Sequence, residues 1–256
     1  MATLYPLVAA AVLGAMIGSF LNVCIYRIPK RRSIVWPGSA CGSCGHSLAW
    51  FENIPVLSYV VLRGRCRACR SAISLRYPFV ELLTAAMFAG AWWLYGPSVL
   101  LLSRLIFGCA LIVLFAIDLE YHLLPNVVTI PGIFVGFAFS FITPPGWVAS
   151  LIGIVVGSGV LWAIAEGYYR LRHEEGLGMG DVKMLAMIGA FVGWKLTLVT
   201  LMMASFAGSI VGVLLIVSRR GGLKYALPFG TFLALGAALA ATIGPGVLDW
   251  YLGFYQ

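Results

Sequence analysis

Charged residues are scarce in this sequence. They make up 10% of its 256 residues, Asp and Glu together number only nine, and hydrophobic residues make up 61%. Soluble domains contain about 25% charged residues. With a mean hydropathy of +0.98, this shortage excludes an ordinary soluble domain. It indicates a polytopic membrane protein, which we expect to be all-α.

A cleavable signal peptide is not expected either. Basic residues do not precede the first apolar run, residues 4–26, but follow it from Arg27 to Arg32. This order predicts a first transmembrane helix with its N-terminus outside. Nine of the 17 Lys and Arg residues lie between Arg27 and Arg76, and most others lie in alternate later loops. The positive-inside rule and attraction to anionic lipid therefore account for the net charge of +8, and we expect no nucleic-acid binding.

The apolar runs predict about eight transmembrane helices, although several are shorter than the roughly 20 residues of a straight span. We expect three parts: a first helix (1–26), a cytosolic cysteine-rich insertion (27–78) and a membrane-embedded domain of about seven helices (79–256). The predicted helices cover residues 3–25, 79–95, 98–117, 127–142, 148–169, 182–194, 196–217 and 228–251. The loops at 27–78, 118–126, 170–181 and 218–227 then face the cytosol.

Four of the six cysteines form two Cys-x-x-Cys pairs in the insertion. Cys41 and Cys44 are separated by 21 residues from Cys66 and Cys69, a spacing typical of zinc ribbons. Four thiolates on two turns can form a closed tetrahedral zinc site. A domain of about fifty residues buries little core, so a bound metal would stabilise it. The alternatives are a redox pair or unrelated thiols. Because the pair occurs twice, structural zinc is favoured.

Two acids mark the candidate chemistry. Asp181 ends the glycine-rich stretch Gly176–Asp181, and Asp118 ends the apolar run 99–117. Acids at the ends of membrane segments indicate functional sites, and the predicted topology places both on the cytosolic side. The alternative is that each acid only caps a turn or helix.

A close pair of carboxylates suits acid–base catalysis. Both do not ionise easily together, so one holds a proton while the other deprotonates an attacking water. Which acid has which part stays open. Gly178 and Gly180 permit positive φ and leave no side chain beside Asp181, so an extended substrate backbone can lie there. The interpretation is therefore an aspartic endopeptidase.

Two other classes compete with this interpretation. A transporter or channel would place polar groups at mid-depth in several spans, but these spans carry almost none. A noncatalytic scaffold that binds partners through its zinc module leaves the Gly-x-Gly-Asp turn unexplained.

The ordered series of motifs resembles the bacterial type 4 prepilin peptidases, aspartic proteases of the Gly-x-Gly-Asp class. The resemblance covers nearly the whole chain. It rests on residues 18–23, the two cysteine pairs, 50–55, 73–82, Asp118 with 124–126, 178–183 and 228–230. Gly42 departs from the family, which commonly has Pro there, but all four sulfurs are kept. A presenilin-like protease shares Gly-x-Gly-Asp without the cysteine-rich insertion.

The resemblance implies a multi-pass enzyme of the bacterial inner membrane. It would remove basic leader peptides from prepilins and pseudopilins at the cytosolic face, with Asp118 and Asp181 as the catalytic pair. Many members also N-methylate the new N-terminus with S-adenosylmethionine; peptidase activity alone is the alternative. The sequence has no glycine-rich strand-to-helix fingerprint of a nucleotide-binding α/β domain. A methyl-donor site beside the cysteines is therefore expected, with Gly18, Asn22, Glu52 and Asn53 as candidates.

Overall fold

The computed structural model describes residues 4–173, 178–218, 227–244, 246 and 253. Gly176 and Leu177 of the glycine-rich stretch, most of the expected loop 218–227 and most of the last predicted helix beyond residue 244 lie outside these ranges. The described residues are helical apart from loops, turns and two isolated β-bridges, as expected. The chain forms two compact units, residues 1–113 and 114–256, and their boundary falls inside helix α4 (Val99–Tyr121).

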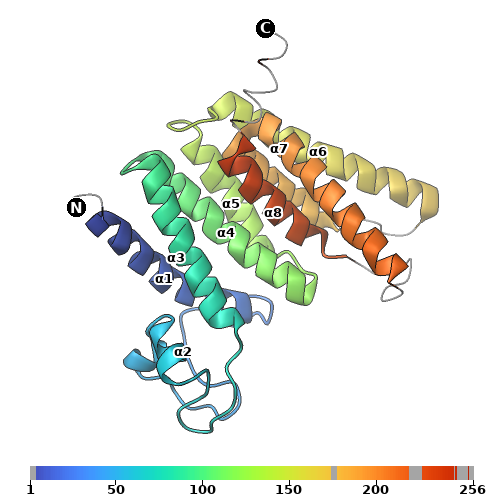
Figure 1. Cartoon of the computed structure of the whole chain (residues 1–256). Coiled ribbons are helices and arrows are strands. Elements are labelled where there is room, and N and C mark those ends of the chain that lie inside the picture. The colour runs from blue at the N-terminus through green and yellow to red at the C-terminus, as the bar shows by residue number, and fades with distance from the viewer. Residues whose placement is uncertain (1–3, 174–177, 219–226, 245, 247–252, 254–256) are drawn as a thin grey trace. The chain divides into compact units, whose positions relative to one another are not determined.

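The first unit is built on two packed helices, α1 (Leu4–Arg27) and α3 (Arg76–Tyr95) (Figure 1). Glycine lets them approach closely. A Cβ atom at Gly14 would lie 2.7 Å from the Phe88 Cβ, and one at Gly18 would lie 2.8 Å from the Glu81 Cα. Between them the chain forms the cysteine module, residues 28–75, with the short helices η1 (Trp50–Asn53) and α2 (Leu57–Val61).

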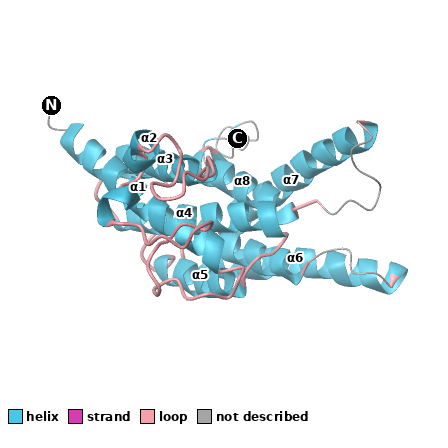
Figure 2. Ribbon diagram, turned by 90° about the horizontal axis from the view of Figure 1, so that it is seen from below, coloured by secondary structure: helices cyan, strands magenta, loops and turns pink. Residues whose placement is uncertain are grey.

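The second unit packs α5 (Asn126–Phe139), α6 (Trp147–Arg172) and α8 (Phe229–Thr242) around α7 (Met179–Val217) (Figures 1 and 2). Helix α7 holds its core: residues 184–193 are all buried. Small residues again bring backbones together, because a Cβ at Gly189 would lie 2.2 Å from the Gly153 carbonyl oxygen.

Helix α7 doubles back at Gly193, where φ is 76° and ψ is 169°. A Cβ at Gly157 would lie 2.8 Å from the Leu185 carbonyl oxygen and 3.2 Å from Thr197 Cγ2. Residues 185 and 197 would stand about 18 Å apart in a straight helix. The 39-residue element is therefore two helical halves, and the break lies two residues before Lys195, where the sequence analysis separated two segments.

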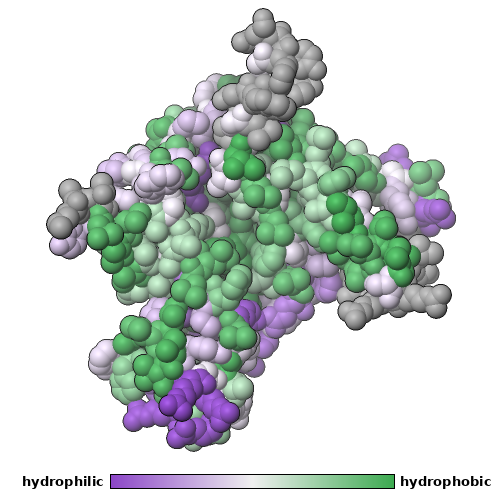
Figure 3. Space-filling view, viewed as in Figure 1, coloured by the Kyte–Doolittle hydropathy of each residue, from purple (hydrophilic) through white to green (hydrophobic). Residues whose placement is uncertain are grey.

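Within the described ranges, four helices are long and apolar enough to cross a membrane: α1, α4, α6 and α7. Their exposed surfaces are rich in large apolar side chains, as Figure 3 shows for one face. Helices α5 and α8, with 14 residues each, are apolar but shorter.

Candidate functional site

The first candidate site lies in the second unit, where α4 ends. Asp118 is only 4% exposed, and its side chain does not cap its own helix. Instead its Oδ2 accepts two hydrogen bonds from Thr231 in the first turn of α8, from the backbone N–H at 2.7 Å and from the hydroxyl at 3.0 Å. The neighbouring Gly230 makes this approach possible, since a Cβ there would lie 3.0 Å from the same oxygen.

Asp181 occupies the first turn of α7 and is half-buried. The helix begins at Met179 with Gly178 as its N-cap, so the alternative that Asp181 caps the helix is wrong. The Asp181 N–H donates to the Gly178 carbonyl at 3.1 Å. Asp118 and Asp181 lie near enough to interact electrostatically. The two acids expected to form a pair therefore belong to one electrostatic site.

Leu124 fills the space between the two glycine-containing turns. A Cβ at Gly180 would lie 2.9 Å from the Leu124 Cβ, and one at Gly230 would lie 2.8 Å from its Cδ1. On the far side of this loop, Lys183 Nζ donates to Asn126 Oδ1 at 3.0 Å and joins α7 to α5. The α4–α5 loop thus fixes the start of α7 beside the end of α4.

The positive φ that these glycines permit is not used. Gly178 has φ −73°, and Gly180 is not among the residues with positive φ. Their use is steric. Gly180 admits Leu124, and Gly178 leaves open the space next to Asp181 Oδ2, which would lie 3.4 Å from an added Cβ.

The four cysteines of the module come together. Their Sγ atoms all lie within 4.8 Å of one another, with Cys41 and Cys69 at 3.9 Å and Cys44 and Cys66 at 4.0 Å. A tetrahedral zinc with Zn–S bonds of about 2.3 Å requires sulfurs about 3.8 Å apart, whereas a disulfide requires about 2.05 Å. The structure records all four as free thiols. The cluster fits a metal ion.

Both cysteine turns have the same construction. The first cysteine of each pair accepts an N–H bond at 3.0 Å from a residue with positive φ, Gly45 or Arg70. A β-bridge closes each turn, Ala40 with Ser47 and Arg65 with Ala72. In the first turn, backbone N–H groups of Cys44 and Ser43 lower the pKa of the Cys41 thiol to about 6. Because metal ligands are thiolates, these N–H groups favour the ligating form of Cys41.

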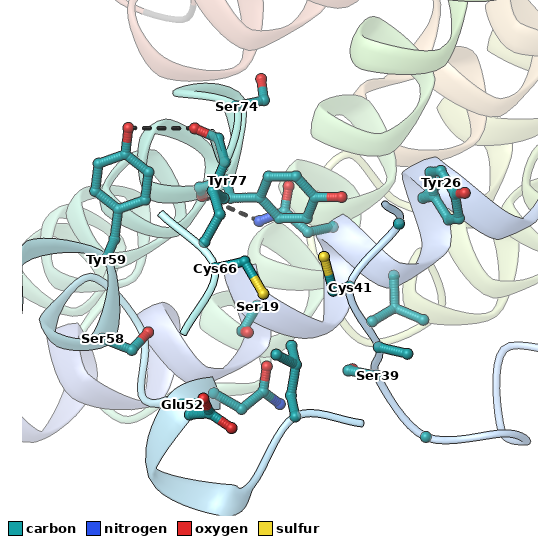
Figure 4. A pocket seen from close by; sticks show the side chains of 18 of the residues that line it. Ser19, Tyr26, Ser39, Cys41, Glu52, Ser58, Tyr59, Cys66, Ser74 and Tyr77 are labelled. Carbon is teal, nitrogen blue, oxygen red and sulfur yellow. Dashed lines mark hydrogen bonds between the residues drawn. The ribbon is translucent and has the colours of Figure 1, made fainter. Parts of the chain in front are cut away.

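A second candidate site is a cavity of about 560 Å³ inside the first unit (Figure 4). Its walls include Cys41 and Cys66, the end of η1 and the facing sides of α1 and α3. Asn22, Glu52 and Asn53, all expected at a cofactor site, line it. Gly18, the fourth candidate, does not line the cavity but packs against α3.

The cavity contains two buried acceptors without partners. Asn22 is 2% exposed and Glu52 is 7% exposed, yet Asn22 Oδ1 and Glu52 Oε1 have no hydrogen-bond donor. The other carboxylate oxygen of Glu52 accepts the Ala49 N–H at 2.8 Å and contacts His46 at 3.3 Å. The Ala49 N–H, supported by His46, lowers the pKa of Glu52. A ligand that donates hydrogen bonds or carries positive charge fits these two oxygens.

Glu81 connects this wall to the helices. Its Oε2 accepts the Val56 N–H at 2.8 Å, and Ser19 of α1 hydrogen-bonds the same side chain. Val56 has φ 61° and ψ −49°, and Leu57 N lies 2.6 Å from the Pro55 carbonyl oxygen. This is a γ-turn of the strained hand, rare for a β-branched residue. Glu81 therefore holds the strained turn that follows Glu52 and Asn53.

The sequence analysis missed Thr231 and gave Glu81 no role. Both lie within or next to segments that carry the family resemblance, Pro228–Gly230 and Val80–Leu82. Their position in or next to these segments was the available sign of a functional role, but it does not indicate which residues they contact.

Comparisons with known proteins agree with the geometry. Residues 12–95 match the model of the bacterial peptidase A24 N-terminal domain, and residues 105–213 match that of the type IV leader peptidase family. A prepilin leader peptidase/N-methyltransferase of Pseudomonas putida is 37% identical, covering 94% of this chain and 91% of that protein. A protein of the same name from Burkholderia pseudomallei is 38% identical, covering 92% of this chain and 84% of that protein. One from Myxococcus xanthus is 42% identical, covering 81% of this chain and 62% of that protein. No solved structure matches the chain.

Proposed function

The chain belongs to the type IV leader peptidase family, and we propose that Asp118 and Asp181 are its catalytic pair. The protein is a prepilin leader peptidase and N-methyltransferase, as its relatives are named. The narrower alternative, a peptidase without methyltransferase activity, is not favoured by these names.

One observation carries the assignment of the pair. Asp118 is buried at a helix end, is oriented by two donors from Thr231, and acts electrostatically on Asp181 in the glycine-rich turn. Two neighbouring carboxylates retain one proton between them. The ionised carboxylate takes a proton from a water as that water attacks the peptide carbonyl. The protonated carboxylate donates its proton to the carbonyl oxygen. When the tetrahedral intermediate collapses, the other carboxylate passes the water proton to the leaving amine, and the first carboxylate recovers its proton from the hydroxyl group.

The turn at Gly178 and Gly180 gives the substrate access. Because no side chain stands beside Asp181 Oδ2, an extended leader peptide can lie along this turn with its scissile bond near both acids. Cleavage would fall at the cytosolic face of the bacterial inner membrane, with the N-terminus outside. The basic residues clustered between Arg27 and Arg76 support this orientation.

About eight membrane helices are proposed for the whole chain. The four long apolar helices supply part of this number, and α3, which is 20 residues or about 30 Å long, is long enough to supply another. The reversal at Gly193 divides α7 into two passes, and α5 and α8 supply short ones. Short helices are tolerated where neighbouring helices enclose them.

A structural zinc ion held by Cys41, Cys44, Cys66 and Cys69 is proposed for the module. The sulfur separations fit tetrahedral ligation, and four protein ligands leave no open position for catalysis. The ion would hold the two turns of this ribbon-like module together. It would thereby fix the cavity wall that contains Cys41 and Cys66.

S-adenosylmethionine is the proposed ligand of the cavity. The cavity volume of about 560 Å³ is in the range of small-molecule sites. When bound, this cofactor supplies the methyl group for the new N-terminus. Asn22 and Glu52 would offer hydrogen-bond acceptors to its amino and hydroxyl groups, and Glu52 and Glu81 would offer negative charge to its cationic groups.

An intact-mass assay tests the proposed catalytic pair. Purified protein is incubated with a prepilin and S-adenosylmethionine, with Asp118→Asn and Asp181→Asn as parallel variants. Wild type is expected to remove the leader and add one methyl group, while neither variant cleaves. Normal cleavage by either folded variant would refute the assignment.

A further inference from the structure

Helix α2 has two different faces. Ser58 and Tyr59 line the cavity. Leu57, Val60 and Val61, spaced as one helical face, are 63%, 65% and 77% exposed, and no residue of this helix is buried. Such an apolar face on a five-residue helix is not stabilised by packing within the described part of the protein, which indicates a missing apolar partner.

The position of α2 identifies that partner. Val56, its N-cap, is hydrogen-bonded to Glu81, and Glu81 packs against Gly18 of α1. Gly18 lies nine residues before the last residue of α1, Arg27, or about 13 Å along the helix. Because α1 is a candidate membrane span, α2 begins beside the membrane-crossing part of the helix pair and not beyond its end.

The charge around α2 agrees with a lipid partner. Residues 27–78 contain nine Lys and Arg residues but only one acidic residue, the buried Glu52. Arg63 and Arg65 directly follow α2 and are exposed. Figure 3 shows hydrophobic and hydrophilic residues next to each other on the module. An apolar face flanked by arginines suits the boundary between anionic headgroups and acyl chains, whereas a basic leader peptide would be repelled.

We propose that α2 is an interfacial helix that inserts Leu57, Val60 and Val61 into the cytosolic leaflet beside α1 and α3. The module is then supported from three directions, by its metal, by Glu81 and by the bilayer. Since the opposite face of α2 lines the cavity, the bilayer also supports one cavity wall. This last consequence, unlike the docking itself, rests on the proposed methyltransferase function.

Photocrosslinking of the full-length protein in nanodiscs tests the docking. Benzoylphenylalanine replaces Val60 in one variant and, as a control, Ala68 in another; Ala68 is exposed in the second cysteine turn. In nanodiscs containing phosphatidylglycerol, irradiation and mass spectrometry are expected to show phospholipid adducts at position 60 at least fivefold above position 68. Equal yields, or no lipid adduct at position 60, would overturn the proposal. So would adducts to added prepilin in place of lipid, which would make the face a substrate surface.

A functional measurement separates this proposal from the proposed function. The variant Leu57→Ser/Val60→Ser/Val61→Ser is compared with wild type in the same nanodiscs. It is expected to raise the KM for S-adenosylmethionine several-fold and to leave leader cleavage and bound metal unchanged. If wild type itself transfers no methyl group, the cavity assignment fails while the crosslinking result still decides the docking. An unchanged KM together with lipid adducts would limit the bilayer's role to anchoring.

Discussion

The bond between Thr231 and Asp118 gives a quantitative prediction. Thr231→Val keeps the size and branching of the side chain and the backbone N–H bond at 2.7 Å, but removes the hydroxyl bond at 3.0 Å. A hydrogen bond to a charged group contributes about 1.5–3 kcal/mol. Asp118 is 4% exposed, so water does not readily replace the lost donor. With one tenfold change in rate per 1.36 kcal/mol, leader cleavage should slow about 10- to 150-fold.

The assay measures kcat and KM for prepilin cleavage. The loss should appear in kcat, because Thr231 orients the catalytic carboxylate and does not itself hold the leader. Thr231→Ser retains the hydroxyl and should stay within about threefold of wild type. Methylation of a mature pilin supplied with a free N-terminus serves as the folding control and should not change. Wild-type kcat in Thr231→Val, or equal losses in the Ser and Val variants, would refute this role of the hydroxyl.

Three further predictions concern the two sites. Glu81→Ala removes the acceptor for the Val56 N–H. Methyl transfer assays should show that this variant raises the KM for S-adenosylmethionine about tenfold or more, that Glu81→Gln restores it, and that leader cleavage is unchanged. A drop in cleavage would instead indicate general misfolding. Gly230→Ala places a Cβ 2.8 Å from Leu124 Cδ1 and 3.0 Å from Asp118 Oδ2; cleavage should fall at least about tenfold with methylation retained, and unimpaired cleavage would contradict the tight fit. Cys66→Ser should lower the zinc content, measured by elemental mass spectrometry, below one ion per chain. It should reduce methylation more strongly than leader cleavage. Full metal content in this variant would argue against four-sulfur ligation.

Local features could be predicted from the sequence. Each Cys-x-x-Cys turn closes within about six residues, so its spacing alone indicates two thiols on one turn, and the repetition indicates a shared ion. The structure brings all four sulfurs within 4.8 Å. The apolar runs likewise predicted the helices, with ends that differ by a few residues: α5 ends at Phe139 where 142 was expected, and α6 extends to Arg172 where 169 was expected.

Long-range contacts could not be predicted in the same way. Thr231 lies 113 residues after Asp118, and no periodicity or spacing joins them. The strained turn at Val56 could not be predicted either, since valine normally avoids positive φ and the Glu81 acceptor that contacts this turn lies 25 residues away. Such contacts depend on how helices pack, which composition and hydropathy do not encode residue by residue.

The glycines show the limit of local reasoning most clearly. Gly178 and Gly180 could adopt positive φ but do not, whereas Gly193 does so where the chain reverses. At the site, glycine provides space for Leu124 and for the region beside Asp181. Both uses follow from the missing Cβ, and only the packing decides which applies.

The central claim is that cleavage and methylation occupy separate sites, one at the acid pair and one in the cavity of the first unit. The most direct measurement supplies Asp181→Asn with two substrates in parallel, a full prepilin and a mature pilin with a free N-terminus, together with S-adenosylmethionine, and records intact masses. The account predicts that the prepilin keeps its leader while the mature pilin gains one methyl group. Leader removal from the prepilin, or failure of a correctly folded variant to methylate the mature pilin, would contradict it.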